Sequence, residues 1–118
     1  MSTDIWPSEI RLDPAKTTLT VAFENGDRFQ LPAEYLRIES PSAEVQGHAA
    51  SQKVTVGGKK NVKITGLEPV GNYAVRILFD DGHDTGLYSW DWLHELGRDQ
   101  NKKWAAYLKS LGAQGLER

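Results

Sequence analysis

Two turn dipeptides constrain the fold of this chain more than any other feature, because each follows a run of β-prone residues. Asn25-Gly26 comes directly after Thr18–Phe23, in which Leu, Val and Phe alternate with Thr and Ala. Asp81-Gly82 comes shortly after the predicted strand Tyr73–Phe79, in which Ala74–Phe79 is the most β-prone run in the chain. Residues of these types tolerate the positive φ that tight hairpin turns demand. We therefore predict an antiparallel hairpin at each dipeptide.

The remaining elements follow from apolar periodicity and from capping signals. The predicted strands are Ile10–Leu12, Thr18–Phe23, Arg28–Leu31, Val62–Leu67, Tyr73–Phe79 and Asp84–Tyr88. The predicted helices are Ala33–Arg37, a helix capped by Ser89 that stops at Gly97, and a last helix capped by Asp99 with the apolar stripe Trp104, Tyr107, Leu108 and Leu111. Residues 40–58 are expected to be loop-rich, and Gln114–Arg118 to fray.

These elements predict a small single α+β domain. It would have an antiparallel-rich β-sheet with hairpins, one short helix, and one or two C-terminal helices packed on the sheet. The length of 118 residues fits one compact domain with its own hydrophobic core.

Composition excludes several classes of protein. The chain has no cysteine, which rules out disulfides, thiolate metal ligands and cysteine nucleophiles. It has no apolar run of 18 residues and no basic, apolar leader sequence, so we expect a cytoplasmic protein that does not bind membranes. The net charge of −2 lacks the basic excess of nucleic-acid binders, so no nucleic-acid partner is expected.

The charged residues are unevenly distributed along the chain. Between Val45 and Leu67 there are four lysines and no acidic residue, whereas Asp80 to Glu95 holds five acidic residues and no lysine or arginine. This separation predicts one basic and one acidic region. Since exposed charge usually only solubilises a protein, the simplest interpretation is two solvated faces.

The motifs of common enzyme classes are missing. The sequence has no G-x-G-x-x-G, no phosphate-binding loop that ends in Gly-Lys-Ser/Thr, and no G-x-S-x-G nucleophile elbow. Gly57-Gly58-Lys59-Lys60 lacks the spacing and the hydroxyl of a phosphate cradle, and a flexible loop tip is the better interpretation. The sequence therefore predicts no enzymatic activity.

The three histidines, His48, His83 and His94, are the remaining residues with distinctive chemistry. A facial iron site needs two histidines and a carboxylate that converge on one face. His48 and His83, with Asp81 or Asp84, supply those ligand types if the fold brings them together. The simpler alternative is that His83 hydrogen-bonds a neighbour in its turn, while His48 lies in a surface loop and His94 on a helix surface.

Several dispersed segments are similar to one family and occur in the family's order. They are Trp6–Arg11, Leu31–Arg37, Ser40–His48, Val70–Ala74 and Phe79–Trp90. On these segments the chain resembles the DUF971 family, also called the gamma-butyrobetaine hydroxylase-like N-terminal domain, and specifically its stand-alone bacterial members. The resemblance covers residues 6–97, which we take as the domain, and leaves residues 98–118 as a C-terminal helix and tail.

The resemblance implies little chemistry for this chain. In the carnitine-pathway hydroxylases the domain precedes an Fe(II)- and 2-oxoglutarate-dependent catalytic domain; nothing follows Arg118 here, so that catalysis is not expected. Those proteins hold a structural zinc through three cysteines and one histidine, and the matching positions here are Ser40, Ser42, Val45 and His83. Serine is a poor zinc ligand and valine is none, so a zinc site of that design is not expected.

A similar domain also lies at the C-terminus of some P-loop ATPases that carry iron–sulfur clusters. A chain without cysteine cannot hold such a cluster by thiolates. The expected function is therefore a small, non-enzymatic interaction module with a protein partner and no cofactor. The two fusion contexts suggest an accessory role in iron–sulfur or 2-oxoglutarate oxygenase systems.

The candidate interaction residues lie on the loop Ser40–His48 and the turn Asp80–Thr85, which the resemblance brings together. They are Ser40, Ser42, Glu44, His48, Asp81, His83 and Asp84. The alternative hypothesis is a module that binds iron or zinc through His48, His83 and a nearby aspartate. Because neutral imidazole is the ligand, such a site would release its metal as the pH falls through about 6.5.

Overall fold

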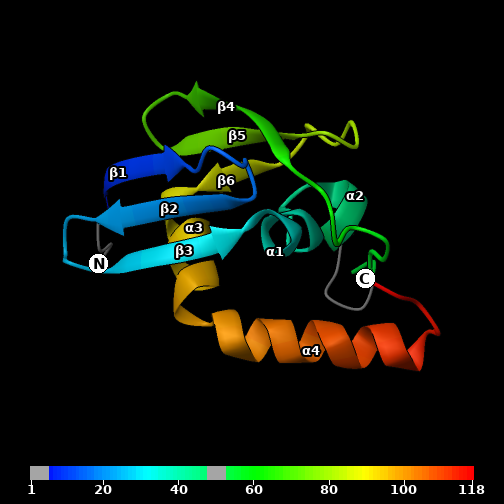
Figure 1. Cartoon of the computed structure of the whole chain (residues 1–118). Coiled ribbons are helices and arrows are strands. Elements are labelled where there is room, and N and C mark those ends of the chain that lie inside the picture. Colours follow the sequence, from blue (N-terminus) through cyan, green and yellow to red (C-terminus); the bar gives the residue numbers. More distant parts are fainter. Residues whose placement is uncertain (1–5, 48–52) are drawn as a thin grey trace.

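The computed structural model describes residues 6–47 and 53–118, and Figure 1 shows their arrangement. Within these two ranges, six strands form two antiparallel sheets of three strands each, and four helices lie around them. The predicted α+β class and the antiparallel pairing of the strands are confirmed. The strands are divided between two sheets, in place of the single sheet predicted from the sequence.

The first sheet has the order β1-β2-β3 and contains β1 (Pro7–Leu12), β2 (Thr18–Phe23) and β3 (Arg28–Pro32). The Asn25-Gly26 dipeptide lies in the turn between β2 and β3, and the φ angle of Gly26 is +98°, so the first hairpin prediction is confirmed. The apolar residues of β2 are buried, and the residues between them are half-buried. One face of this sheet therefore lies against the core.

The second sheet has the order β4-β5-β6 and contains β4 (Ile64–Val70), β5 (Ala74–Phe79) and β6 (Leu87–Ser89). Gly82 turns the chain after β5 with a φ angle of +90°, and the Phe79 N–H donates to the His83 carbonyl at 3.0 Å. The predicted start of the return strand at Asp84 is wrong. Residues 83–86 leave the ladder and contact the segment after the first helix, so the strand begins only at Leu87.

The first two helices are short and follow β3 directly. Helix α1 (Ala33–Ile38) is the predicted helix, extended by one residue. Helix α2 (Ala43–Gln46) lies in the stretch that was expected to be loop-rich. Its N-cap is Ser42, whose hydroxyl oxygen accepts a hydrogen bond from the N–H of Glu44 at 3.2 Å. Four residues are too few to show an apolar period, which explains why the pattern missed this helix.

The last two helices are α3 (Trp90–Arg98) and α4 (Gln100–Ala113). Ser89 caps α3 as predicted, because its hydroxyl accepts from the N–H of Trp92 at 3.1 Å. The predicted stop at Gly97 is wrong, since α3 continues to Arg98. A Cβ at Gly97 would lie 2.2 Å from the ring of Phe29, so this glycine lets α3 pack closely on β3.

Three further expectations about the C-terminal region need correction. The Asp99 side chain makes no capping hydrogen bond to α4 and instead contacts the Arg98 guanidinium. In the predicted stripe of α4, Tyr107 and Leu111 are buried, whereas Leu108 is exposed. The segment after α4 does not fray: it folds back, and the C-terminus lies beside residues 53–60 in Figure 1.

One core joins both sheets and the helices. It includes Leu19 and Val21 of the first sheet, Ile64 and Ile77 of the second, and Leu93 of α3. Two buried tyrosines connect helices to this core: the Tyr35 hydroxyl donates to the Leu96 carbonyl at 2.7 Å, and the Tyr88 hydroxyl donates to the Leu36 carbonyl at 2.6 Å. Tyr88 thereby connects β6 with α1, next to the candidate site. Within residues 6–47 and 53–118, no helix is long and apolar enough to cross a bilayer.

Candidate functional site

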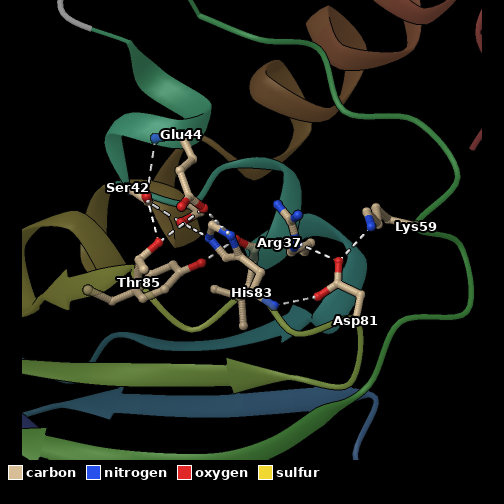
Figure 2. A network of polar contacts seen from close by, with 10 residues as sticks. Arg37, Ser42, Glu44, Lys59, Asp81, His83 and Thr85 are labelled. Carbon is tan, nitrogen blue, oxygen red and sulfur yellow. Dashed lines mark hydrogen bonds and ion pairs between the residues drawn. The ribbon is translucent and has the colours of Figure 1, made fainter.

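Two segments that are far apart in the sequence meet in the polar network of Figure 2. Ser40 follows α1, and His83 lies in the turn after β5. The hydroxyl oxygen of Ser40 lies 2.8 Å from Nε2 of His83, although 43 residues separate them in the chain. Both residues are buried. The structure therefore brings the loop after α1 and the turn after β5 together.

His83 has a partner at both ring nitrogens and at its backbone N–H. Nδ1 lies 3.2 Å from Oε1 of Glu44, Nε2 contacts Ser40, and the N–H donates to Oδ1 of Asp81 at 3.1 Å. Burial lowers the pKa of His83, and Arg37 adds to this effect, against the carboxylates of Glu44 and Asp81. A neutral ring that donates from Nδ1 to Glu44 and accepts at Nε2 from Ser40 satisfies both contacts.

A row of hydroxyl contacts extends the network toward the surface. The hydroxyl oxygen of Ser42 lies 2.8 Å from that of Thr85, which donates to Oε1 of Glu44 at 3.3 Å. The backbone N–H of Ser42 donates to the hydroxyl oxygen of Ser40 at 3.2 Å. We call Ser40, Ser42, Glu44, His83 and Thr85 the Ser40–His83 cluster. Its contacts join the start of α2 to the turn after β5.

Gly86 is the residue that allows the two segments to approach. A Cβ on Gly86 would lie 2.5 Å from the hydroxyl oxygen of Ser40 and 3.0 Å from the ring of Tyr88. Any side chain there would therefore displace Ser40 from His83.

Asp81 lies at the other end of the network and pairs with two cations. Its Oδ2 lies 2.8 Å from Nε of Arg37 and 2.6 Å from Nζ of Lys59. Partial burial acts to raise the pKa of Asp81, but the hydrogen bonds from Lys59, the His83 N–H and Arg37 outweigh it and lower the pKa to about 2. Asp81 is therefore a charged ion-pair partner that fixes the turn.

Arg37 and Lys59 belong to this network, although no sequence pattern marked them as candidate residues. The interpretation of Lys59 as part of a flexible loop tip is wrong, because its ammonium group is held by Asp81. No local motif indicates either contact. Within the described ranges, Nη1 of Arg37 is buried without a hydrogen-bond partner.

Ser40 contacts His83, and His83 contacts Glu44. A serine hydrolase connects its nucleophile, its general base and its orienting carboxylate in the same sequence. The serine of this series is not exposed. Ser40 is fully buried, and its hydroxyl oxygen also accepts from the N–H of Ser42. Three open cavities in the described part of the chain are lined by other residues.

The residues at the zinc positions implied by the resemblance do not fit a metal. Val45 is buried and has no donor atom, and the hydroxyls of Ser40 and Ser42 already bond to His83 and Thr85. Among the residues that the structure describes, no three histidines or carboxylates are grouped to hold an ion. His94 lies apart from the cluster and contacts Asp27 at 2.7 Å. His48 lies outside the described residues.

The other candidate residues are placed as follows. Glu44 lies on the outer side of the cluster, with its side chain 65% exposed. Asp84 is exposed between His83 and Thr85. Asp81 touches the cluster only through the backbone of His83. The structure thus places four of the seven residues in the cluster, Asp81 and Asp84 beside it, and leaves His48 undescribed.

Two short antiparallel sheets on a shared core, with a buried serine–histidine cluster between the start of α2 and the turn after β5, define a class of small α+β domain. A comparison with protein families matches residues 10–94 to the family described as gamma-butyrobetaine hydroxylase-like, N-terminal. The chain belongs to this family, as its sequence motifs indicated. A comparison with curated proteins finds no match.

Solved structures of similar chains support the fold. Two proteins solved by NMR in solution are 48% and 45% identical, with TM-scores of 0.82 and 0.83. The matches cover 97% and 100% of this chain and 90% of each relative. A crystal structure from Acidithiobacillus ferrooxidans, of a protein of unknown function in the DUF971 family, is 35% identical with a TM-score of 0.64 over 77% of this chain and 91% of that one.

Proposed function

We propose that this domain is a non-enzymatic interaction module that binds the basic surface of a protein partner. The contact surface would be the acidic rim, which we define as Ala43, Glu44, Asp84 and Thr85. All four residues are exposed and lie over the buried part of the Ser40–His83 cluster or directly beside it in the chain. The observation that carries the proposal is this combination of an exposed rim and a buried support.

The buried support preorganises the rim. Glu44 is held by Nδ1 of His83 and by the hydroxyl of Thr85, and both contacts use Oε1. Among residues 6–47 and 53–118, no hydrogen bond uses its Oε2, which can therefore accept one from a partner. Because these rotamers are fixed before binding, association loses less side-chain entropy than it would at a flexible surface.

The charge of the rim favours a basic partner. Glu44 and Asp84 are exposed, whereas the nearby Asp81 is neutralised by Arg37 and Lys59. Two carboxylates on a fixed surface attract lysine or arginine side chains and speed the encounter.

The same geometry argues for binding over catalysis. A nucleophile needs access to its substrate, and Ser40 has none in the described structure, since it is completely buried. A metal needs free donors, and those of Ser40, Ser42 and His83 are used within the cluster. The proposal includes a cytoplasmic location and no cofactor.

Charge reversal on the rim tests the proposal. Asp84→Lys changes the rim without removing any contact of the cluster, and Glu24→Lys reverses a matched exposed acid in the β2–β3 turn. Tagged wild type and both variants are used for affinity purification from source cells, with quantitative mass spectrometry. A basic protein captured by wild type and Glu24→Lys, and reduced at least tenfold with Asp84→Lys, would support the proposal.

Folding of each variant is checked by circular dichroism before the purification. The proposal is contradicted if wild type and both variants capture the same proteins in the same amounts. It is equally contradicted if the captured partner is lost with Glu24→Lys as much as with Asp84→Lys.

A further inference from the structure

The segment after α4 carries a contact that the proposed function does not use. The Leu116 N–H donates to the Leu111 carbonyl at 2.9 Å, and the Gly58 N–H donates to the Glu117 carbonyl at 2.8 Å. These bonds turn the chain back toward α1. They place the guanidinium of Arg118 against the carboxylate of Glu34, 84 residues away in the sequence.

The contact between Arg118 and Glu34 has the geometry of guanidinium recognition. Nε of Arg118 lies 3.0 Å from Oε2 of Glu34, and Nη2 lies 2.7 Å from Oε1. The guanidinium also lies over the ring of Trp104, 5.2 Å from its centroid. The planar guanidinium group of arginine can donate to both carboxylate oxygens while it stacks on an aromatic ring. The ammonium group of lysine is not planar and cannot make this pair of contacts, so the geometry is specific for arginine.

The two partners of this ion pair differ in exposure. The side chain of Glu34 is only 7% exposed, whereas that of Arg118 is 43% exposed. Residues 115–118 are all exposed, so only a few contacts hold the segment. Local opening of such a segment costs little free energy, and it uncovers the Glu34 carboxylate, which can then accept another guanidinium. The Glu34 carboxylate is therefore an acceptor that becomes accessible when the segment opens.

An open cavity adjoins the guanidinium. It has a volume of about 290 Å³, and its wall includes Tyr35, Gln100, Asn101 and Trp104. The side-chain amides of Gln100 and Asn101 have donors and acceptors suited to the backbone of an extended peptide. Arg118 thus lies in a site with room for further residues beside it.

We propose that Glu34 and Trp104 form an arginine-recognition site, which Arg118 occupies in cis and which an arginine-bearing peptide of a partner protein occupies when residues 115–118 swing away. The site shares no residue with the acidic rim. Its existence does not depend on the proposed function of that rim.

A competition experiment tests this site. Wild type and Arg118→Ala are titrated with the blocked peptide acetyl-Gly-Leu-Glu-Arg-amide and with the same peptide ending in lysine, and the indole signal of Trp104 is followed by NMR. We expect Arg118→Ala to bind the arginine peptide at least tenfold more tightly than wild type does. It should also prefer the arginine peptide at least tenfold over the lysine peptide, and Glu34→Gln in the same background should abolish binding.

The other outcomes overturn the proposal. They are equal binding of the arginine peptide by wild type and Arg118→Ala, no binding by either, equal affinity for the two peptides, and unchanged binding after Glu34→Gln. A concentration-dependent dimer of wild type that Arg118→Ala abolishes would instead assign the site to a second copy of this chain. If Arg118→Ala folds poorly, Arg118→Gln takes its place in every arm.

Discussion

The Ser40–His83 cluster and the Glu34–Arg118 contact both join distant segments, but by opposite means. The cluster uses several hydrogen bonds between largely neutral groups, and Ser40, Ser42 and His83 are buried. The Glu34–Arg118 contact is one ion pair whose arginine is 43% exposed. The first joins parts of the folded core, whereas the second holds a terminal segment against it.

This difference in burial and bonding indicates which of the two contacts is a fixed part of the fold. Breaking one bond in the cluster leaves a buried donor or acceptor unpaired, at a cost of about 1–3 kcal/mol for each group. Ion pairs with an exposed partner contribute about 0–1 kcal/mol. The cluster should therefore persist as long as the protein is folded, and the C-terminal segment should open on its own.

The largest effect is expected from adding a methyl group at Gly86. Gly86→Ala places a Cβ against the hydroxyl of Ser40 and the ring of Tyr88, so it should separate Ser40 from His83. We expect a loss of about 2–4 kcal/mol in the free energy of unfolding, measured by urea denaturation. Gly112→Ala is the matched control, since a Cβ there meets no atom within 4 Å, and it should be neutral or slightly stabilising. Equal stability of the two variants would show that the cluster is not tightly packed.

A smaller effect with a distinctive pH dependence is expected for His83→Gln. Loss of the ring leaves Ser40 and Glu44 without their shared partner and should cost about 1–3 kcal/mol at pH 7.5. Since burial and Arg37 lower the pKa of His83 in the folded state, the unfolded chain takes up the proton first as the pH falls below 6.5. The contribution of His83 is thus fully present above pH 6.5 and declines below it. Urea denaturation of wild type and His83→Gln should show a smaller difference in the free energy of unfolding at pH 5.5 than at pH 7.5. A difference that does not change with pH would contradict the assignment of a neutral His83.

Much of the fold could be predicted because its signals are local. The hairpin after β2 follows from Asn25-Gly26, and the cap of α3 follows from Ser89. The predictions for Gly97 and for the segment after α4 were wrong because residues far away in the sequence determine the local structure there. By sequence Gly97 is a helix stop signal, but the close approach of the Phe29 ring explains the glycine. The segment after α4 folds back because it contacts Glu34 and Gly58, which lie far from it in the sequence.

The candidate site was predictable mainly through family resemblance. No spacing rule relates Ser40 to His83 across 43 residues, and the family motifs alone placed the two segments together. Glu44 was selected with them and does contact His83. Arg37 and Lys59 were missed because an ion pair between elements leaves no periodic or motif signal in the sequence.

The central claim is that the Ser40–His83 cluster is a fixed part of the fold, while residues 115–118 are held reversibly. Native-state hydrogen exchange tests it directly, because each region supplies hydrogen-bonded amides: Ser42, Glu44 and His83 in the cluster, and Gly58 and Leu116 at the C-terminal segment. We predict that the cluster amides exchange only through global unfolding and the other two through local opening with a much lower free energy. Equal protection of the two sets, or faster exchange in the cluster, would contradict the account.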